Sequence, residues 1–593
     1  MPAGGYLALL WRGGTDLDIA AKNATTRLEA EGAFALAADR PGLRLWTCGR
    51  RLPVRKLGDA VIVGDLLQRS PATCASRVGG VVTPKRLASE FWGRYVAFWP
   101  GMVPVLYRDP SGLIDSLHWQ IADGLFVVSS DLRSTPPWLR PRRLSLNWER
   151  VACYLANPTA HTTATLFDDM AAVGPGELQL LDGHSLPELV WRPSRFAAAT
   201  SGGPPELAAE LVRQIDQCTA ALAGLHHRLI VEISGGLDSS IVATSLAATG
   251  QAGRVAAWLN RAGAPDGDEQ CYARSIADRL GVDLTGVVKP LAPLVEDDFA
   301  ELADATWPAM NGVEAWRDRD DVARLGATGA DAFVCGQGGD AVFFQIPTPL
   351  IVSDEMRAKG LAALGSPLLP EVARRSRQSV WSVLRHAIGP ANRRRSVMMT
   401  PSRLVSREIR AAVNRAAHRW GEDALEAGLP PAKAMQIAGI ANHHVYHGDS
   451  RRRRVAETLF PLLAQPVVEL CLSISIPDLT RGGDDRPFAR AAFADRLPRS
   501  VLERRRKGAQ SRHFAQLIAA SLPTLGPMLL DGCLSDAGVL DRTAVERMLD
   551  RRQLIWEPRS SEILWAATVE AWVRHWQRRT PDAPSATRWS FRL

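Results

Sequence analysis

The residues best suited to chemistry stand together in the stretch 231–247, between a β-branched run and an alanine-rich run. The first run has the length and composition of a strand, and the second has those of a helix. Between them stand Ser234, Gly235, Gly236, Leu237, Asp238, Ser239 and Ser240. A glycine turn at a helix N-terminus presents free N–H groups, and the helix dipole attracts negative charge. The stretch therefore predicts a loop that binds phosphate.

Asp238 distinguishes this loop from a plain phosphate cradle. Its carboxylate would repel a bare phosphate, so its presence predicts a bridging Mg²⁺. The loop lacks the Gly-Lys-Ser/Thr of the Walker A pattern, which excludes that class of ATP-binding loop. An ordinary Gly-Ser turn before a buried helix is the alternative, but the whole run in its strand–turn–helix context argues against it.

The elements that must position this loop alternate between strand and helix. The pattern predicts helices over 206–223 and 268–280, and strands ending at 233 and over 254–259, 282–288 and 332–335. Such alternation predicts a parallel, doubly wound sheet with ligands at the carboxyl ends of its strands. The stretches 343–441 and 509–593 are helical in pattern. Residues 206–593 therefore predict an α/β domain with a largely helical C-terminal part.

Residues 1–195 have a different organisation. Short apolar runs over 1–11, 93–98, 105–112 and 125–131, with a turn at 173–177, predict packed β-sheets in an α+β sandwich. A Pro-, Gly- and Ala-rich linker over 192–205 separates them from the second domain. This order of strands resembles the glutamine-hydrolysing domain of class II amidotransferases. That family uses an N-terminal cysteine as nucleophile, whereas Pro2 and Cys48 here imply a domain that does not hydrolyse glutamine.

Composition narrows the class of protein. The chain of 593 residues is 46% hydrophobic, has no apolar run of membrane-spanning length, and has no basic segment typical of a signal peptide. Eight scattered cysteines without a CxxC pair predict reduced thiols in a cytoplasmic protein. The net charge of +8 comes largely from arginine runs. Nucleic acid, ATP, an acidic peptide or solvent would each suit such runs, so charge alone does not choose.

Two motifs carry a resemblance to known families. Residues 234–240 resemble the pyrophosphate loop of the ATP-pyrophosphatases, which cleave ATP between the α and β phosphates and transfer AMP to a carboxylate or carbonyl. Residues 336–340 resemble the Gly-Glu-Gly-Ser-Asp-Glu element of asparagine synthetases. This resemblance implies that Asp238 and Asp340 share Mg²⁺, and that Cys335 and Gly336 belong to the ATP site.

The stretch 457–508 extends the resemblance. Glu457 stands four residues before Pro461, as a glutamate does in asparagine synthetases, although Ala464 replaces the aspartate of that element. Lys507-Gly508 matches the element that closes the family's pattern. By resemblance to the β-lactam synthetases, Lys507 is expected to stabilise charge on the acyl-adenylate transition state. If the reaction uses a general base, Glu457 is the candidate for it.

Gln337 affects the choice of nucleophile. It stands where asparagine synthetases have Glu and β-lactam synthetases have Tyr, and a glutamine cannot act as a base. An α-amino group, with a pKa of about 7.7–8.0, needs less help than an amide nitrogen. Gln337 thus favours a peptide N-terminus as the attacking amine. The spacing of His443, His444 and His447 suits a metal, but without a cysteine or carboxylate partner, surface or core histidines explain it better.

Together these features resemble the lasso-peptide cyclases. In that family an Asp or Glu side chain of a core peptide is adenylated, and the peptide's own N-terminal amine closes a macrolactam. The resemblance implies ATP and Mg²⁺ as cofactors, a core peptide as substrate, and a leader-peptide protease and a leader-binding protein as partners. The alternatives are a small-molecule amide synthetase of the β-lactam or ammonia-using asparagine type, and a non-catalytic or RNA-binding relative.

Overall fold

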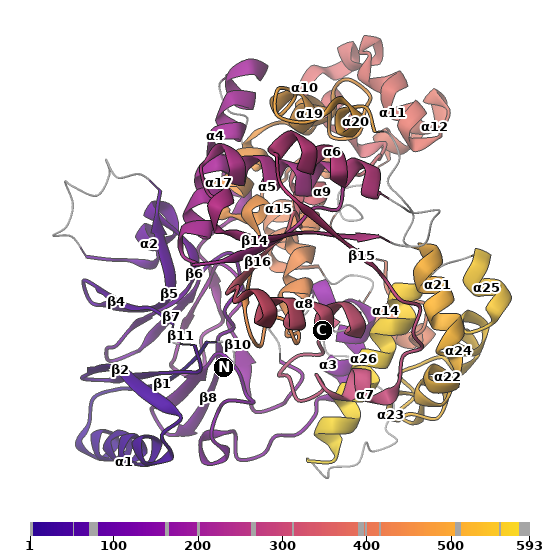
Figure 1. Cartoon of the computed structure of the whole chain (residues 1–593). Helices are drawn as coiled ribbons and strands as arrows, with labels where there is room; N and C mark the ends of the chain where they lie inside the picture. The colour runs from indigo at the N-terminus through magenta and orange to yellow at the C-terminus, as the bar shows by residue number, and fades with distance from the viewer. Residues whose placement is uncertain are drawn as a thin grey trace.

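The computed structural model describes most of the 593 residues. The described ranges are 4–50, 52–69, 81–160, 165–197, 202–262, 269–310, 314–389, 397, 400–413, 417–504, 511–556 and 559–579. The candidate cation Lys507 lies outside these ranges. Figure 1 shows a sheet-rich N-terminal part, a second sheet-containing part, and helices that dominate the C-terminal part.

Two six-stranded sheets form the N-terminal part, in the orders β10-β8-β9-β1-β3-β2 and β12-β11-β7-β6-β5-β4. Neighbouring strands run antiparallel. The first sheet contains β1 (Gly5–Trp11), β2 (Phe34–Arg40), β3 (Leu43–Cys48), β8 (Leu117–Ala122), β9 (Leu125–Ser129) and β10 (Ala171–Ala172). The second contains β4 (Val54–Leu57), β5 (Ala60–Gln68), β6 (Phe91–Trp99), β7 (Val105–Arg108), β11 (Glu177–Leu180) and β12 (Glu188–Leu189).

Helices accompany both parts of the chain. The N-terminal part contains α1 (Thr15–Glu31), α2 (Pro84–Glu90) and α3 (Trp148–Ala156). The central part contains α4 (Pro204–Gly224), α5 (Leu237–Ala248), α6 (Gln270–Leu280), α7 (Glu296–Ala300), α8 (Ala315–Thr328), α9 (Gly339–Val342), α10 (Leu350–Lys359), α11 (Leu368–Ser376), α12 (Val380–Ile388), α14 (Arg407–Val413), α15 (Arg419–Glu426) and α16 (Pro431–Ala441). The last part contains α17 (Gln465–Ser473), α18 (Ile476–Thr480), α19 (Pro487–Ala492), α20 (Arg499–Leu502), α21 (Ser511–Ala520), α22 (Leu522–Leu530), α23 (Cys533–Asp536), α24 (Arg542–Met548), α25 (Arg551–Trp556) and α26 (Ser560–Gln577).

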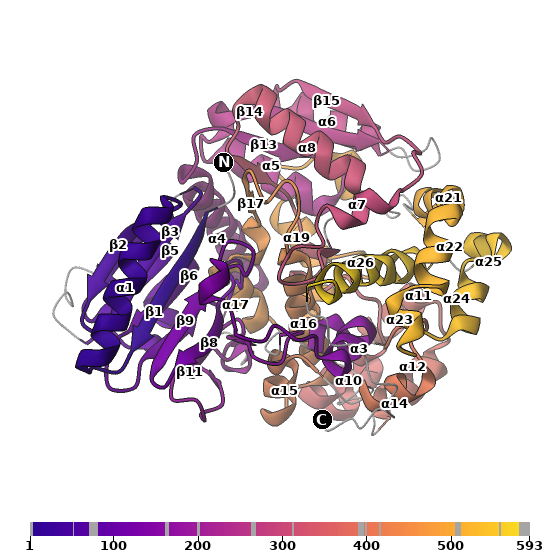
Figure 2. The same ribbon diagram turned by 90° about the horizontal axis from the view of Figure 1, so that it is seen from below.

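The two antiparallel sheets stack face to face. Because side chains alternate along a strand, Tyr6 and Leu10 of β1 pack between the sheets with Phe98 of β6. Leu9 and Trp11 point to the other face, where they join a core that includes side chains of α1 and α26. The packed sheets expected from the sequence are therefore confirmed, and α1 lies against the first sheet (Figure 2).

A five-stranded sheet lies in the second part, in the order β15-β14-β13-β16-β17. Its strands are β13 (Leu229–Glu232), β14 (Val255–Ala262), β15 (Leu284–Val288), β16 (Ala332–Val334) and β17 (Glu457–Leu459), and all neighbours run parallel. Val231 packs on one face with Ile241 of α5, and Ile230 packs on the other with Leu325 of α8. Apolar side chains therefore cover both faces, which confirms the doubly wound arrangement.

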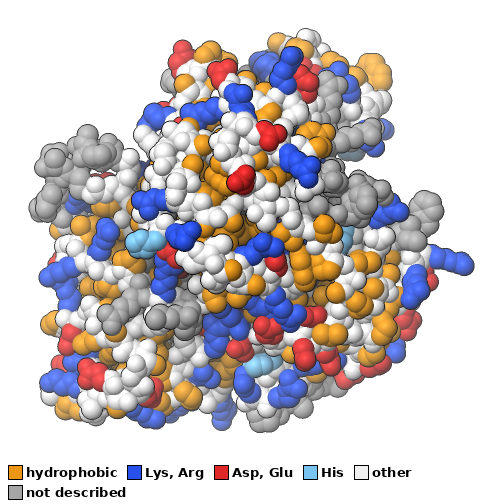
Figure 3. All heavy atoms as spheres, viewed as in Figure 1, with side chains coloured by type: hydrophobic (Ala, Val, Ile, Leu, Met, Phe, Trp, Pro, Cys, Tyr) orange, Lys and Arg blue, Asp and Glu red, His pale blue; other side chains and the backbone are white. Residues whose placement is uncertain are grey.

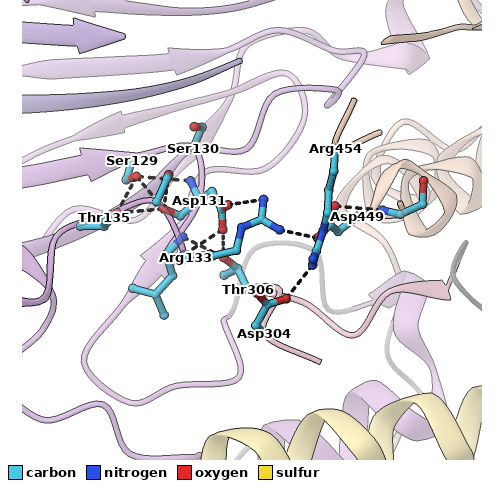
Figure 4. A network of polar contacts seen from close by, with 12 residues as sticks. Ser129, Ser130, Asp131, Arg133, Thr135, Asp304, Thr306, Asp449 and Arg454 are labelled. Atoms are coloured by element: carbon cyan, nitrogen blue, oxygen red, sulfur yellow. Dashed lines mark hydrogen bonds and ion pairs between the residues drawn. The ribbon is translucent and has the colours of Figure 1, made fainter. Parts of the chain in front are cut away.

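The two parts of the chain share a polar interface (Figure 4). Arg133, which follows β9, contacts Asp131 at 3.0 Å and Asp449 at 3.3 Å. Arg454 binds the same Asp449 and also Asp304, each at 2.6 Å. Ion pairs with little solvent around them are screened less by salt than exposed ones. This network joins the antiparallel sandwich to the loops around the parallel sheet.

The arginine run 451–454 is used inside the structure. Arg451 is 5% exposed and donates to the carbonyl of Asp298 at 2.8 Å. Arg452 pairs with Asp321 at 2.8 Å and stands 4.7 Å over the ring of Phe333. The arginine run therefore makes hydrogen bonds and ion pairs inside the structure and does not form a basic surface. On the face shown in Figure 3, Lys and Arg side chains are spread among acidic and apolar ones.

Two further expectations concern helices and thiols. Within the described ranges, the seven cysteines are all unpaired, as expected of reduced thiols. No single helix among the described residues has the length and apolar character to cross a membrane. One strongly bent pair, Arg512–Ala520 with Leu522–Asp536, passes that test by length and composition only.

Candidate active site

The predicted phosphate loop follows the carboxyl end of β13, where a parallel sheet places its ligands. Gly235 has a φ of 77°, and a Cβ on it would lie 2.8 Å from the carbonyl oxygen of Glu269. Only glycine therefore fits this turn without strain. Gly236 then caps α5, which begins at Leu237. The first N–H groups of a helix lack acceptors within the helix, so the loop presents them at its open end.

The loop's side chains hold its own shape. Ser239 Oγ accepts from the N–H of Ser234 at 3.1 Å and lies 3.0 Å from the Ser234 hydroxyl. Ser240 is fully buried and donates to the carbonyl of Gly236 at 2.7 Å. Leu237 is 3% exposed and anchors the turn in the apolar core. The backbone of this loop, more than its serine hydroxyls, is thus available to an anion.

The second predicted loop lies directly against the first. A Cβ on Gly336 would lie 2.4 Å from the nitrogen of Ser239, and one on Gly339 would lie 2.5 Å from Cγ of Asp238. Such distances leave no room for a side chain, so the two glycines allow the loops to meet. Cys335 joins the second loop to the sheet, since its N–H donates to the carbonyl of Leu459 at 3.3 Å. Burial raises the pKa of the Cys335 thiol to about 11, which makes it a packing residue and not a nucleophile.

Asp238 points at an arginine from the C-terminal part of the chain. Nη1 of Arg486 lies 2.6 Å from Oδ1 and 2.6 Å from Oδ2 of Asp238. Nη2 of the same guanidinium lies 2.6 Å from Asp485. Side-chain exposure is 17% for Asp238 and 7% for Arg486. A cation therefore already occupies the oxygens that the sequence assigned to magnesium.

Asp340 stands at the start of α9 with half of its side chain exposed. Its Oδ1 lies 3.6 Å from Nε2 of His443, whose Nδ1 lies 3.3 Å from Nε2 of Gln337. Two of the predicted site residues, Asp340 and Gln337, therefore meet at one imidazole. Because Gln337 has no titratable group, this contact positions the ring and moves no proton.

The three histidines of the 443–447 group have separate surroundings. His443 lies at the site, whereas Nε2 of His444 lies 3.2 Å from the carbonyl of Pro110 and Nδ1 of His447 lies 3.1 Å from that of Ser111. Burial lowers the pKa of both His444 and His447 well below normal, so both stay neutral. The structure thus agrees with the preference for core histidines at 444 and 447, and adds His443 to the site.

The two acidic loops suit a magnesium ion by their chemistry. Asp238 and Asp340 offer hard carboxylate oxygens on adjoining loops, and the guanidinium at Asp238 shows that the position favours a cation. Mg²⁺ binds through one or two carboxylates when phosphate oxygens and water complete its shell. Among the described residues, no group of three or more His, Cys, Asp or Glu side chains forms a metal site. Magnesium at this place would therefore depend on a bound phosphate.

A buried charge network supports the sheet beside the loops. Glu232, the last residue of β13, contacts Arg317 at 2.7 Å and Arg261 at 3.7 Å. Burial would raise the pKa of Glu232, but the charges of Arg317 and Arg261 outweigh it and hold the pKa below normal. The negative charge of Glu232 is thus balanced by two arginines. We therefore assign the role of metal ligand to Asp238 and Asp340.

Glu457 is not brought to the loops. It begins β17 and pairs in register with Ala332, whereas the loops follow the other ends of β13 and β16. Its carboxylate forms an ion pair with Arg94 of β6, in the N-terminal sandwich. Burial alone would raise the pKa of Glu457, but Arg94 outweighs it and lowers the pKa to about 2. A carboxylate held in this way joins the domains and is a poor proton acceptor.

The segment that leads to Lys507 is anchored at the phosphate loop. Arg504 donates to the carbonyl of Gly235 at 2.8 Å, and its guanidinium stands 4.4 Å over the ring of Tyr272. Arg490 donates to the carbonyls of Val501 and Leu502, both at 2.8 Å. Arg490 thereby fixes the backbone that carries Arg504. Lys507 lies in the gap between the described ranges 417–504 and 511–556, so the role of that lysine stays a prediction.

A cavity with a largely apolar lining lies between the two parts of the chain. Its lining includes Trp92, Trp191, Trp420, His443 and Phe460. His443 lines this cavity and also contacts Gln337, so the cavity adjoins the candidate site.

Sequence reasoning missed Arg486 and His443. No local pattern marks Arg486, because 248 positions separate it from Asp238. His443 stood in a group judged by its helical spacing, whereas residues Asn442–His447 form a 3₁₀-helix, which turns these side chains to different neighbours. The segment 481–490 contains three arginines and two aspartates, so its charge does not single out Arg486.

Comparison with known proteins identifies a family for the part of the chain that contains this site. The family model described as asparagine synthase matches residues 215–578, which span β13, both loops and the segment with Arg486. A search of curated proteins finds no match.

Proposed function

The chain belongs to the asparagine synthase family, whose members form amides at the expense of ATP, and on that basis we propose that it is a peptide macrolactam synthetase. The enzyme adenylates an Asp or Glu side chain of a core peptide. The N-terminal amine of the same peptide then closes the ring. AMP and pyrophosphate are released.

The meeting of the two loops carries this proposal. Asp238 and the first turn of α5 lie against Gly336 and Gly339, and Asp340 follows Gly339 directly, which supports a site with helix N–H groups and two carboxylates. Anions bind at helix N-termini, and a triphosphate with its cation suits the mixture of donors and acids. Mg²⁺ would be held by Asp238 and Asp340 and would supply charge neutralisation for the leaving pyrophosphate.

The chemistry proceeds in two balanced steps. A carboxylate oxygen of the peptide attacks the α-phosphorus, the bond to the β-phosphate breaks, and pyrophosphate leaves with the electron pair. The amine nitrogen then attacks the acyl carbon, AMP leaves, and the nitrogen gives up a proton. The loop N–H groups stabilise the leaving pyrophosphate, and Lys507 offsets the charge on the tetrahedral centre and on AMP.

The N-terminal amine of the peptide can attack without activation by a strong base. Gln337 contacts His443 and takes the position where the related families have Glu or Tyr. A glutamine cannot accept a proton. A peptide α-amine is partly deprotonated at neutral pH, with a pKa of about 7.7–8.0. A prefolded peptide keeps its amine close to the activated acid, and this proximity is worth about 7–11 kcal/mol in well-oriented cases.

The proposal extends to partners. A core peptide must lose its leader before its α-amine is available, so a leader-peptide protease and a leader-binding protein are proposed to act with this enzyme. Cytoplasmic location and the absence of a nucleic-acid partner belong to the same proposal. The nearest other activity is a small-molecule amide synthetase that uses aspartate with ammonia, or a β-amino acid.

Product analysis tests this proposal. The protein is incubated with ATP, Mg²⁺ and synthetic core peptides whose acceptor residue is varied, and ³¹P NMR follows the phosphates. AMP and pyrophosphate, with a peptide that has lost the mass of one water, are expected. ADP and inorganic phosphate would refute adenylation. Turnover with aspartate and ammonia, or with a β-amino acid, but not with any peptide would refute the macrolactam assignment while leaving adenylation intact.

A further inference from the structure

Arg486 is an unusual residue for the contact that it makes. It has a φ of 51° and a ψ of 53°, in the left-handed region, and it directly precedes Pro487. Among the described non-glycine residues, only Phe344 and Arg377 also have a positive φ. A residue before proline is normally extended, so this backbone is strained. Strain of this kind persists where surrounding contacts impose it, and it concentrates at functional sites.

The two side chains that form ion pairs with Arg486 are both acidic. Arg486 lies between Asp238 of the phosphate loop and Asp485, its own neighbour in sequence. Nη1 faces both oxygens of Asp238, while Nε at 3.1 Å and Nη2 at 2.6 Å face Asp485. Asp485 thus holds one side of the guanidinium, and the other side faces Asp238 in the phosphate loop.

This arrangement conflicts with the work assigned to Asp238. Both of its oxygens accept from one nitrogen of Arg486, and a divalent cation on the same carboxylate would repel the guanidinium, which favours its displacement. Asp485 keeps hold of Nε and Nη2 when Nη1 is released, so the displaced group stays beside the loop. The released Nη1 of Arg486 could then donate hydrogen bonds to an anion bound on the phosphate loop.

We propose that Arg486 is a positioning residue that neutralises Asp238 before the substrate arrives and exchanges this partner for a phosphate of ATP when a divalent cation takes the Asp238 carboxylate. The planar guanidinium suits phosphate because two of its N–H groups can bind two oxygens at once. The exchange keeps positive charge beside Asp238 in both states. This inference rests on the proposed function, because it requires ATP at the same loop.

A permanent clamp is the opposing model. In that case Arg486 holds Asp238 in every state, no cation reaches the carboxylate, and Arg486 never touches phosphate. The two models differ in what removal of the guanidinium does to binding. Under exchange, the cation alone binds more tightly and ATP with cation binds more weakly. Under a permanent clamp, removal of the guanidinium would also expose Asp238 to the cation, but it would not weaken the binding of ATP with cation, because Arg486 never touches phosphate.

Binding measurements on the full chain separate exchange from a clamp. The wild-type protein is compared with Arg486→Gln, Arg486→Lys and a control, Arg496→Gln. Arg496 lies in the same segment and pairs with Asp216 at 2.8 Å, away from the loop. EPR titration measures Mn²⁺ alone, and isothermal calorimetry measures ATP with Mg²⁺. Circular dichroism checks the fold of each variant.

We expect Arg486→Gln to bind Mn²⁺ alone at least fivefold more tightly and MgATP at least tenfold more weakly than wild type. Arg486→Lys keeps the charge without the fork and should lose at least threefold in MgATP affinity. The control should change neither value by more than twofold. Unchanged MgATP affinity in the Gln variant overturns the exchange, as does unchanged Mn²⁺ affinity. If the Gln variant does not fold, equal MgATP affinity in the Lys variant overturns it.

The same titrations distinguish this inference from the proposed function. A wild-type protein that binds MgATP as tightly as Arg486→Gln leaves the proposed function standing and removes only the exchange. A wild-type protein that binds no MgATP removes both.

Discussion

Glu457 offers the sharpest quantitative test of the structure. The sequence made it a candidate base, whereas the structure pairs it with Arg94 across the two parts of the chain, with side-chain exposures of 13% and 15%. The pKa of Glu457 falls from 4.5 to about 2. Since a tenfold change in an equilibrium is worth about 1.4 kcal/mol, the ionised carboxylate of Glu457, with Arg94 as its main partner and smaller contributions from Arg453 and His226, contributes on the order of 3 kcal/mol to stability at neutral pH. Glu457→Gln should therefore destabilise the protein by about that amount while leaving the chemical step in place.

A double-mutant cycle measures the pair directly. Wild type, Glu457→Gln, Arg94→Met and the double variant are unfolded in urea, and tryptophan fluorescence follows the transition in which the two parts separate. The coupling energy between Arg94 and Glu457 should lie well above the about 1 kcal/mol of exposed pairs, as expected for a buried pair. The exposed pair Arg12–Asp123, at 2.6 Å, is the control and should show a much smaller coupling.

The pH dependence has a defined sign. The folded pKa of Glu457 is depressed, so its contribution is complete above the unfolded pKa near 4.5 and is lost as the pH falls through about 2. The stability difference between wild type and Glu457→Gln should therefore shrink below pH 4.5. A coupling energy below about 1 kcal/mol, which is the range of exposed pairs, would refute this reasoning. Abolished turnover with unchanged stability would restore Glu457 as a base.

Three further predictions concern the loops. Asp238→Asn and Asp340→Asn should each abolish AMP formation with the fold retained by circular dichroism, and turnover near the wild-type rate in either variant would contradict the assignment of that carboxylate. Gly336→Ala should weaken ATP binding at least tenfold in calorimetry, because its Cβ would lie 2.4 Å from a backbone nitrogen of the phosphate loop, whereas Gly253→Ala, with open space around its Cβ, should change nothing. Lys507→Met should lower kcat by about 10²–10³ with little change in ATP affinity, as expected for a group that stabilises only the transition state, and an unchanged kcat would remove Lys507 from the mechanism.

Local pattern was enough to predict the centre of this molecule. The run 234–240 combines a positive-φ glycine, a helix N-terminus and an acid within one turn, and each requirement leaves its mark on the residue types. The strands around it were recognisable because short β-branched runs bounded by turn residues are typical of buried strands. β17 was missed because Glu457–Leu459 is only three residues long and follows an arginine run that looks exposed in sequence.

Contacts between distant segments could not be predicted in this way. Asp238 and Arg486 are 248 positions apart, and Arg94 and Glu457 belong to different parts of the chain. Whether an acid binds a metal, accepts a proton or pairs with arginine depends on such neighbours, because each changes its pKa and its accessible oxygens. The resemblance to a family identified the loops, but the partner of each carboxylate emerged only from the fold.

A structure of the protein with Mg²⁺ and a non-hydrolysable ATP analogue tests the central claim most directly. We expect one magnesium ion bound by both Asp238 and Asp340, with the terminal phosphates of the analogue on the backbone N–H groups of the 234–240 loop. A nucleotide bound elsewhere, or two carboxylates that face different ions, would contradict the assignment of this site.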